Sequence, residues 1–325
     1  MRTLIAGGGT GGHLTPVLAV AQELRRTDPG GDVLIVGRRG GVAENLVGRA
    51  GFTLRTLHIS GLDISNARSV FRFAARSPAA VLASRRLIAD FGADVVVGGA
   101  GYVSVPVVVA ASLLRVPVVL LEQNALPGRA TRFLARRARV VATAFAETAS
   151  HLKGVRVVQT GNPIREEVLA QLPRPLADRP RSLLVMGGSQ GARRINRAVA
   201  GCVADLLDAH PDLTVVHQTG ARDIAEMEGA RRRLAPALQA RYEVTAFIDD
   251  VGAALNRADL VLMRAGGSSL AECTAFGRPM ILVPYPHAGG HQRFNAEPYA
   301  AAGAARVVAD ADCEPGRVRR ELSAL

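Results

Sequence analysis

The feature that most constrains the fold is a strand–turn–helix pattern that occurs twice in the chain. Near the start, the apolar run Thr3–Ala6 enters a turn of sequence GGGTGGH, and a helix is expected over Leu14–Arg26. In the second half, Leu183–Met186 enters a turn of sequence GGSQGA, and a helix is expected over Ile195–Ala209. Short apolar strands that alternate with helices are typical of parallel sheets covered on both faces. Two such turns predict an α/β protein with two Rossmann-like, doubly wound parallel-sheet domains.

Other apolar runs of strand length extend the pattern. They are Val33–Gly37, Asp94–Gly98, Pro117–Leu121, Val140–Thr143 and Val155–Gln159 in the first half, and Thr214–Gln218, Tyr242–Ala246, Leu260–Met263 and Met280–Pro284 in the second. A helix is expected over Ser268–Phe276, and the proline- and arginine-rich stretch 174–181 is interpreted as a loop. The pattern restarts after Pro163, so we expect two domains, residues 1–162 and 163–325. Ligands of such folds bind at the carboxyl ends of the strands, so a cleft between the domains is the expected site.

The positive charge of the chain is concentrated in its first half. The formal net charge is +12, from 40 Lys and Arg against 28 Asp and Glu. Residues 1–162 carry 20 basic and 9 acidic side chains, a net charge of +11, whereas residues 163–325 carry 20 and 19, a net charge of +1. This asymmetry indicates an anionic partner for the first half: membrane headgroups, a pyrophosphate substrate or nucleic acid. Aromatic residues make up 4% of the chain and no nucleic-acid-binding motif occurs, so nucleic acid is not expected.

Cysteine usage and hydropathy bear on the compartment. Cys202, Cys273 and Cys313 are scattered, which excludes a disulfide framework and a cysteine zinc site and favours a reducing cytoplasm. Residues 1–9 are interpreted as a strand entering glycines, not as a signal peptide. The stretch most similar to a membrane span, Val103–Leu121, contains one arginine and two prolines, and we expect a helix followed by a buried strand there.

The first glycine turn is a candidate active site. Glycines let the backbone approach a ligand closely, and the start of the following helix favours an anion. A dinucleotide site would need an acidic residue after the second strand, and Gly37-Arg38-Arg39 stands there, so NAD binding is disfavoured. No Gly-Lys-Ser/Thr triplet supports a P-loop. His13, beside five glycines, is the candidate for proton transfer, with a structural histidine at a helix start as the alternative.

Three later clusters have related chemistry. The turn 187–192 suits either phosphate binding or simple strand–helix packing. Glycines and serines open a helix in residues 264–272, RAGGSSLAE, where Glu272 suits two ribose hydroxyls or stabilises the helix dipole. His287 and His291 are four residues apart, but the Gly-Gly between them disfavours a helix, so no metal is expected. No G-x-S-x-G elbow and no usable pair of carboxylates occurs, which disfavours hydrolases.

Eight ordered segments, spread over most of the chain, resemble one family. They are GGGTGGHLTPVLAVAQEL (7–24), GGAGYVSVP (98–106), LLEQNALPGRATRFLA (120–135), TGNPIR (160–165), MGGSQGARRIN (186–196), FIDDV (247–251), RAGGSSLAE (264–272) and HQRFNA (291–296). They look like the signature of MurG, a family of bacterial peptidoglycan glycosyltransferases. The resemblance implies the two-domain GT-B fold. Residues 1–162 would form an acceptor-binding and membrane-associating domain, and residues 163–325 a UDP-sugar-binding domain.

The resemblance also implies an activity. Enzymes of this family transfer GlcNAc from UDP-GlcNAc to the muramoyl sugar of lipid I, an undecaprenyl-pyrophosphoryl acceptor, and so form lipid II. They invert the anomeric centre and need no metal and no other cofactor. The expected location is peripheral, on the cytoplasmic face of the bacterial plasma membrane. The expected process is cell-wall biogenesis and, through it, cell shape and division.

Residue roles follow from the same resemblance. Donor-binding residues would be Thr10, Gly11, Gly12, Asn124, Arg165, Ser189, Ile248, Gly267, Ser268, Ser269, Glu272, His291 and Gln292. Of these, Ser189 and Arg165 would contact the diphosphate and Ile248 the uracil. The backbone of residues 267–269 would bind phosphate, Glu272 the ribose, and His291 with Gln292 the sugar. Acceptor-side residues would be Gly8, Gly9 and Tyr102. His13 is the first choice for the catalytic base and Glu122 the second.

A basic amphipathic surface is expected in the first half. Its first cluster of arginines is interleaved with apolar residues and consists of Arg68, Arg72, Arg76, Arg85 and Arg86. Its second cluster consists of Arg129, Arg132, Arg136, Arg137 and Arg139. Such a surface suits anionic lipid, which predicts peripheral membrane attachment that salt weakens. An ordinary solvated helix face is the alternative.

Three other functions stay open from the sequence. A related GT-B glycosyltransferase would act on another lipid or secondary-metabolite acceptor. A UDP-sugar epimerase would reuse the nucleotide site, and a basic surface binder would keep a vestigial one. Gly289 and Gly290 also depart from the family pattern, because family members usually carry an acidic residue just ahead of the His-Gln pair.

Overall fold

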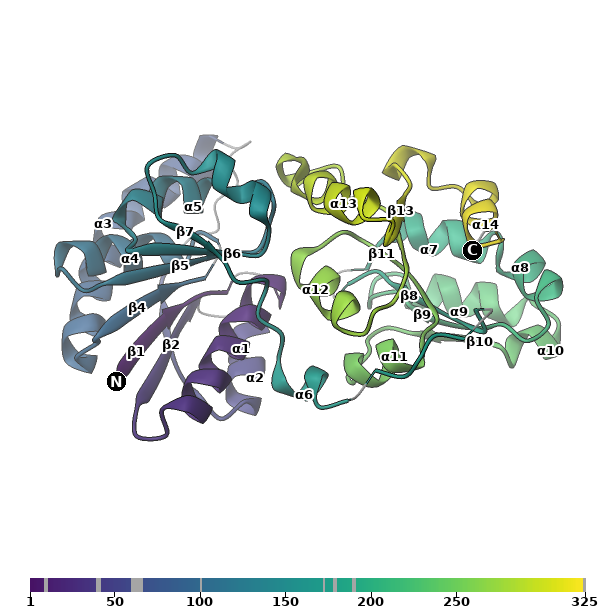
Figure 1. Ribbon diagram of the computed structural model, residues 1–325, viewed down its shortest axis with the longest axis horizontal. Coiled ribbons are helices and arrows are strands. Elements are labelled where there is room, and N and C mark those ends of the chain that lie inside the picture. Colours follow the sequence, from purple (N-terminus) through teal and green to yellow (C-terminus); the bar gives the residue numbers. More distant parts are fainter. Residues whose placement is uncertain are drawn as a thin grey trace. The chain divides into compact units, whose positions relative to one another are not determined.

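The computed structural model divides the chain into two compact units, Met1–Glu166 and Glu167–Leu325 (Figure 1). It describes residues 1–8, 11–38, 42–59, 67–99, 101–171, 173–177, 180–188 and 191–323. The first unit continues four residues beyond the boundary expected after residue 162. Each unit has its own sheet and its own hydrophobic core.

The first unit is built on a parallel sheet. Its strands are β1 (Arg2–Ala6), β2 (Asp32–Arg38), β3 (Thr53–Leu57), β4 (Val95–Gly98), β5 (Val118–Glu122), β6 (Val140–Thr143) and β7 (Val157–Gln159). Across the described residues their order is β3-β2-β1-β4-β5-β6-β7, and every pairing is parallel. The apolar-run pattern missed β3, because its sequence TLRTL alternates polar and apolar side chains at the edge of the sheet.

Helices cover both faces of this sheet (Figure 1). They are α1 (Gly11–Thr27), α2 (Val42–Arg49), α3 (Ala67–Phe91), α4 (Ser104–Leu113) and α5 (Arg129–Leu134), with 3-10 turns η1 (Ala135–Arg137) and η2 (Ala146–His151). Successive strand residues point to opposite faces. Leu4 and Ala6 of β1 therefore pack in the core with residues of α3 and α4, whereas Ile5 packs with Leu14 of α1.

The second unit repeats this plan. Its strands are β8 (Ser182–Met186), β9 (Thr214–Gln218), β10 (Tyr242–Thr245), β11 (Leu260–Met263), β12 (Met280–Leu282) and β13 (Ala305–Val307). Its main helices are α7 (Arg193–Ala200), α8 (Val203–Ala209), α9 (Ile224–Arg232), α10 (Pro236–Gln239), α11 (Val251–Arg257), α12 (Gly267–Ala275), α13 (His291–Ala301) and α14 (Pro315–Ser323), and α6 (Glu166–Leu169) stands at the junction of the units. The sheet order is β10-β9-β8-β11-β12-β13. If the strands of each unit are numbered from one along the chain, both sheets have the order 3-2-1-4-5-6, and the first sheet has one further strand.

The single helix expected over residues 195–209 is wrong, because the structure has two helices there. α7 ends at Ala200 and α8 begins at Val203. A Cβ on Gly201 would lie only 2.6 Å from Cγ of Pro315, the first residue of α14. The interruption therefore lets the last helix pack against the break, and Cys202 is buried beside it.

The apolar stretch Val103–Leu121 folds as its sequence predicts. It contains α4, which packs against one face of the first sheet, and most of the buried strand β5. The two are separated by Arg115, whose φ is 59°, and by Pro117. Within the described ranges, no helix combines the length and the apolar character that crossing a bilayer requires.

Candidate functional site

Both sheets reverse their strand order at one place. β2 and β4 flank β1 in the first unit, and β9 and β11 flank β8 in the second. The loops after β1, β4, β8 and β11 therefore lie at the carboxyl edges where ligands of doubly wound sheets bind. All four loops contain glycines: Gly7-Gly8, Gly99, Gly187-Gly188 and Gly266-Gly267. The structure thus places the glycine clusters seen in the sequence at the position in each unit that best suits a phosphate ligand.

Glycine is required beside β1 because the backbone packs too closely for a side chain. A Cβ on Gly7 would lie 2.4 Å from Cγ2 of Val17, and a Cβ on Gly99 would lie 2.6 Å from the same atom. Gly99 also donates its N–H to the carbonyl of Ala6 at 2.7 Å. Gly8 has a φ of 116°, which strongly favours glycine. The close packing of Val17 on Gly7 and Gly99 therefore explains why glycine is needed at both positions.

The turn after Gly8 is only partly described. Gly9 and Thr10 lie outside the described residues, and so does the side chain of His13. Gly11, Gly12 and His13 are the first three residues of α1. The backbone of His13 therefore stands at the N-terminus of a 17-residue helix, beside the point where the sheet reverses.

Glu122 ends β5 and organises the loop that follows it. Its side chain is 2% exposed. Oε1 accepts hydrogen bonds from N and Nδ2 of Asn124 at 3.0 and 3.1 Å. Oε2 accepts one from the N–H of Gly128 at 3.0 Å and one from the hydroxyl of Thr131. Four donors on one buried carboxylate hold this loop, and with it the predicted site residue Asn124, in a defined conformation.

Tyr102 is hydrogen-bonded to an arginine that was not among the predicted site residues. Nη1 of Arg38 donates to the hydroxyl of Tyr102 at 3.2 Å. Arg38 ends β2, two residues beyond the pair that Val36 forms with Ala6 of β1, so it lies at the carboxyl edge of the sheet. The sequence did contain a signal for a role of Arg38, because this arginine follows the second strand, where a dinucleotide site would need an acidic residue. A cation at this place suits an anionic ligand.

The turn after β8 is folded tightly on itself. A Cβ on Gly187 would lie 2.7 Å from the backbone N of Ala192, and a Cβ on Gly191 would lie 2.3 Å from the carbonyl oxygen of Thr219. Gly188 and Gly191 have φ values of 74° and 75°. Ser189, the predicted diphosphate contact, lies outside the described residues. The described parts of the turn have the close backbone packing that an anion-binding loop requires.

A buried polar network lies beside this turn. His217 of β9 is hydrogen-bonded through Nε2 to Oδ1 of Asn196 at 3.1 Å and through Nδ1 to the hydroxyl of Tyr242 at 2.8 Å. Nδ2 of Asn196 donates to the carbonyl of Thr219 at 2.9 Å, so Oδ1 is the acceptor and Nε2 of His217 carries the proton. Burial lowers the pKa of His217 to about 3, which keeps the ring neutral. Since Gly191 packs on Thr219, the network fixes the shape of the turn.

The start of α12 is a second anion-binding feature of this unit. Its N-cap is Gly266, which has no side chain to cover the helix end, and its first turn contains no acidic residue. The predicted residues Gly267, Ser268 and Ser269 form that first turn. The first N–H groups of a helix have no partner inside the helix and carry the positive end of its dipole, which suits phosphate. Glu272, the predicted ribose ligand, is buried one turn further along.

The loop after β10 carries the predicted uracil contact, Ile248, which is half-buried. Thr245 donates its hydroxyl to the carbonyl of Phe247 at 2.9 Å. Asp250 caps α11 by accepting a hydrogen bond from the N–H of Ala253 at 2.8 Å. The loop is thus held at both ends. Phe247 was not predicted at the site, yet it is an exposed aromatic residue at this edge of the sheet.

His291 and Gln292 open α13, directly after Gly289 and Gly290. The two glycines have φ values of 78° and 70°, a conformation that other residues rarely adopt. A Cβ on Gly289 would also lie 3.1 Å from Nε2 of His291. Oε1 of Gln292 accepts a hydrogen bond from the N–H of Tyr285 at 3.0 Å, so Nε2 is its group for a ligand. The departure from the family pattern is therefore built into the backbone of this turn.

Arg165 precedes α6, and its contacts place it in the first unit. The predicted donor-binding residues are consequently divided. Asn124, Arg165 and the start of α1 belong to the first unit, and Ile248, residues 267–269, Glu272, His291 and Gln292 to the second. In the part of the chain that the structure describes, no three His, Cys, Asp or Glu side chains form a metal-binding cluster.

The predicted basic surface lies on the helices of one face of the first sheet. Residues 68–86 are in α3, and the second arginine cluster lies in α5, η1 and the residue before β6. The exposed arginines of this surface are Arg68, Arg76, Arg85, Arg86, Arg129, Arg132, Arg136, Arg137 and Arg139. The side chain of Arg72 lies outside the described residues.

Comparison with known proteins identifies the family. The N-terminal domain of glycosyltransferase family 28 matches residues 3–143, and the C-terminal domain of that family matches residues 182–325. A UDP-N-acetylglucosamine–N-acetylmuramyl-(pentapeptide) pyrophosphoryl-undecaprenol N-acetylglucosamine transferase of Anaeromyxobacter sp. (strain Fw109-5) is 42% identical, covering 100% of this chain and 85% of the relative. The crystal structure of Acinetobacter baumannii MurG has a TM-score of 0.74 at 27% identity, covering 99% of this chain and 90% of that one. The chain belongs to the MurG family.

The fold is the GT-B fold of this family. The glycotransferase of kitacinnamycin, at 18% identity, has a TM-score of 0.71 and covers 100% of this chain and 90% of its own, which shows the same fold in a more distant protein. As a MurG family member the chain is a UDP-GlcNAc-dependent glycosyltransferase, and the expectations of family, fold and enzyme class from the sequence are confirmed.

Proposed function

We propose that the chain transfers N-acetylglucosamine from UDP-GlcNAc to undecaprenyl-pyrophosphoryl-MurNAc-pentapeptide, with inversion and without a metal. These are the donor and the acceptor that the names of the relatives state. The observation that carries the proposal is 42% identity over the whole chain to such a transferase. It favours this function over the epimerase and surface-binder interpretations.

In this proposal the second unit supplies most of the contacts to UDP-GlcNAc, and the first unit supplies those to the acceptor. The second unit binds UDP-GlcNAc, with the turn after β8 and the start of α12 on the diphosphate, Glu272 on the ribose and Ile248 on the uracil. His291 and Gln292 bind the sugar. The first unit binds the acceptor, with the Gly7–Gly8 turn and Tyr102 near its pyrophosphate. The net charge of +11 in residues 1–162 and the position of Arg38 support this division.

The chemistry needs a base for the acceptor hydroxyl and stabilisation of the leaving UDP. His13 is the proposed base, because an imidazole titrates near neutral pH and the residue stands at the N-terminus of α1. Backbone N–H groups and Arg165 stabilise the diphosphate in place of a metal. Glu122 already accepts four hydrogen bonds, which supports a role in positioning Asn124 rather than in proton transfer.

The location we propose is peripheral, on the cytoplasmic face of the plasma membrane. The exposed arginines of α3 and α5 support attachment to anionic lipid, because each basic side chain near such a surface contributes about 1 kcal/mol. A polyprenyl acceptor is embedded in the same membrane, so attachment also brings the enzyme to its substrate.

The experiment that tests the function is one incubation of the purified protein with UDP-GlcNAc and a short-chain acceptor analogue, read by mass spectrometry. We expect a disaccharide product and UDP in equal amounts. His13→Ala should lower kcat by roughly 10²–10⁴-fold if His13 is the base. Unchanged turnover in that variant would remove His13 from this role. UDP-GlcNAc binding without transfer by the wild type would instead point to another acceptor.

A further inference from the structure

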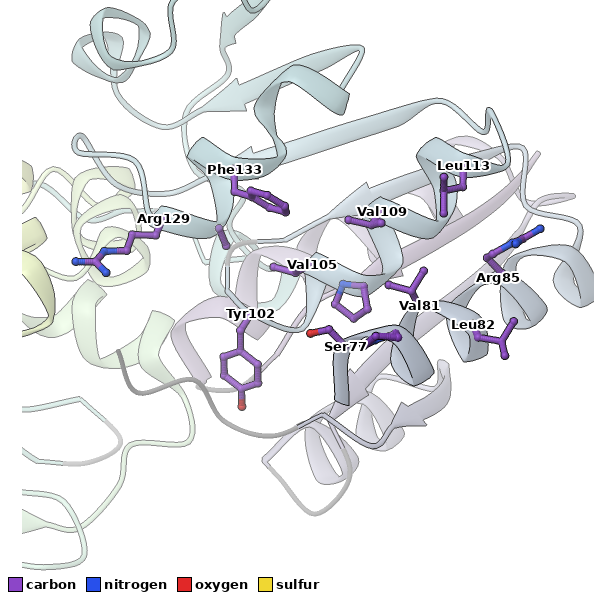
Figure 2. Close-up of a pocket in the computed structure, with 13 residues that line it drawn as sticks. Ser77, Val81, Leu82, Arg85, Tyr102, Val105, Val109, Leu113, Arg129 and Phe133 are labelled. Atoms are coloured by element: carbon purple, nitrogen blue, oxygen red, sulfur yellow. The ribbon is translucent and has the colours of Figure 1, made fainter. Parts of the chain in front are cut away.

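The first unit contains an apolar groove between three of its helices (Figure 2). Its volume is about 840 Å³. α3 contributes Val81 and Leu82, α4 contributes Val105, Val109 and Leu113, and α5 contributes Phe133. This groove was not foreseen from the sequence, which indicated a basic amphipathic surface but not a hollow within it.

Water is a poor occupant for such a groove. Leu82, Leu113 and Phe133 are 50%, 63% and 55% exposed, so large apolar side chains line its rim as well as its floor. Contiguous exposed apolar surface of this kind marks a binding site for an apolar partner. An apolar ligand, or the apolar part of a larger one, is therefore the chemistry that the groove would accept.

One end of the groove is polar and lies near the predicted acceptor site. Tyr102 is at that end, and Leu113 and Arg85 are at the other (Figure 2). The hydroxyl of Tyr102 accepts its hydrogen bond from Arg38 at the carboxyl edge of the sheet, where β1 enters the Gly7–Gly8 turn. The groove therefore runs from the edge where Arg38 lies, along apolar side chains of α3, α4 and α5, to Leu113 and Arg85 at its far end.

We infer that the groove binds the first isoprene units of the polyprenyl chain of the acceptor. A polyprenyl diphosphate has the same order of properties, an anionic head followed by an extended apolar chain. The nine residues from Val105 to Leu113 span about 12 Å of helix, long enough for a few isoprene units. A flat membrane surface would contact the rim, whereas a single chain can reach the floor at Val109. This inference rests on the proposed function, because that function supplies the acceptor.

The test measures initial rates in solution, without vesicles or detergent and below the concentration at which the acceptors form micelles. The acceptors carry the same sugar peptide diphosphate on prenyl chains of increasing length, from one to four isoprene units. Each buried methylene changes binding by about fourfold, so we expect KM for the wild type to fall at least tenfold along the series while kcat stays constant.

The variant Leu82→Asn/Leu113→Asn should lose most of this dependence on chain length and keep the wild-type KM for the shortest acceptor. Both side chains are exposed, so the change does not disturb the core. Leu176→Asn is the matched control, because Leu176 is 49% exposed but lies in the second unit. It should keep the full chain-length dependence.

Two results would overturn the inference. A wild-type KM that does not depend on chain length would show that the groove does not bind the chain. A dependence that the double variant retains would place the chain elsewhere, and loss of vesicle sedimentation in that variant would then assign the groove to the membrane surface. Absence of transfer with every acceptor, including the shortest, would instead contradict the proposed function itself.

Discussion

Glu122 is a candidate catalytic base in the sequence, but in the structure its carboxylate holds the loop that follows β5. Its carboxylate is buried, lies at the carboxyl edge of the first sheet and accepts four hydrogen bonds from its own loop. These bonds run from a strand end to residues as far as nine positions away. Sequence spacing does not show them, because they depend on how the loop turns back on β5.

We therefore predict that Glu122→Gln mainly lowers stability. The amide would replace one acceptor oxygen by an NH₂ group that faces existing donors, and a buried donor without an acceptor costs about 1–3 kcal/mol. Denaturant unfolding should show a loss of this size, with a smaller effect on kcat than that of His13→Ala. Wild-type stability with a large fall in kcat would instead make Glu122 the base.

Among single residues, the sequence predicted the positions that require glycine better than it predicted which side chains form hydrogen bonds with one another. Gly7 and Gly187 were identified because a glycine turn after a strand has few explanations. Arg38 and His217 were not, because their roles come from contacts with Tyr102 and Asn196, which are distant in the chain. A local pattern reports a local backbone constraint, whereas a hydrogen bond across strands needs the sheet order first.

At the scale of elements, contacts between helices determine helix ends that the hydrophobic periodicity of the sequence does not show. The break between α7 and α8 lies at Gly201, where a Cβ would be 2.6 Å from Cγ of Pro315 at the start of α14. Helical periodicity continues across this position, so the sequence predicted one helix. The strands were easier to place, since most of them are short apolar runs. β3 and β13 were missed because their sequences, TLRTL and ARV, are interrupted by polar side chains.

The glycine at the break gives a direct test. Gly201→Ala should lower the free energy of unfolding by about 1–3 kcal/mol, because the new methyl group would overlap Cγ of Pro315. Gly229→Ala, inside α9, is the control, because a Cβ there would have its nearest neighbour at 3.8 Å. That variant should gain about 0.5–1 kcal/mol from helix propensity. Equal effects of the two changes would contradict packing as the cause of the break.

At the scale of the whole molecule, the position of charge matters more than its total. We predict that the protein sediments with anionic vesicles and is released by salt, because exposed arginines cluster on α3, α5 and η1. Arg86→Ser/Arg136→Ser should weaken binding by up to about 2 kcal/mol. Arg232→Ser/Arg233→Ser removes the same charge from exposed positions of the second unit and should leave binding unchanged. Equal losses in both variants would show that net charge alone drives the interaction.

The two sheets share a strand order, and their cores share no residue. A substitution that reshapes the interior of one unit therefore leaves the interior of the other unchanged. Under the division of substrates that we propose, a change in the core of one unit would alter the choice of acceptor or the choice of sugar nucleotide, but not both. Each half is thus a separate target for redesign, with the boundary between Glu166 and Glu167.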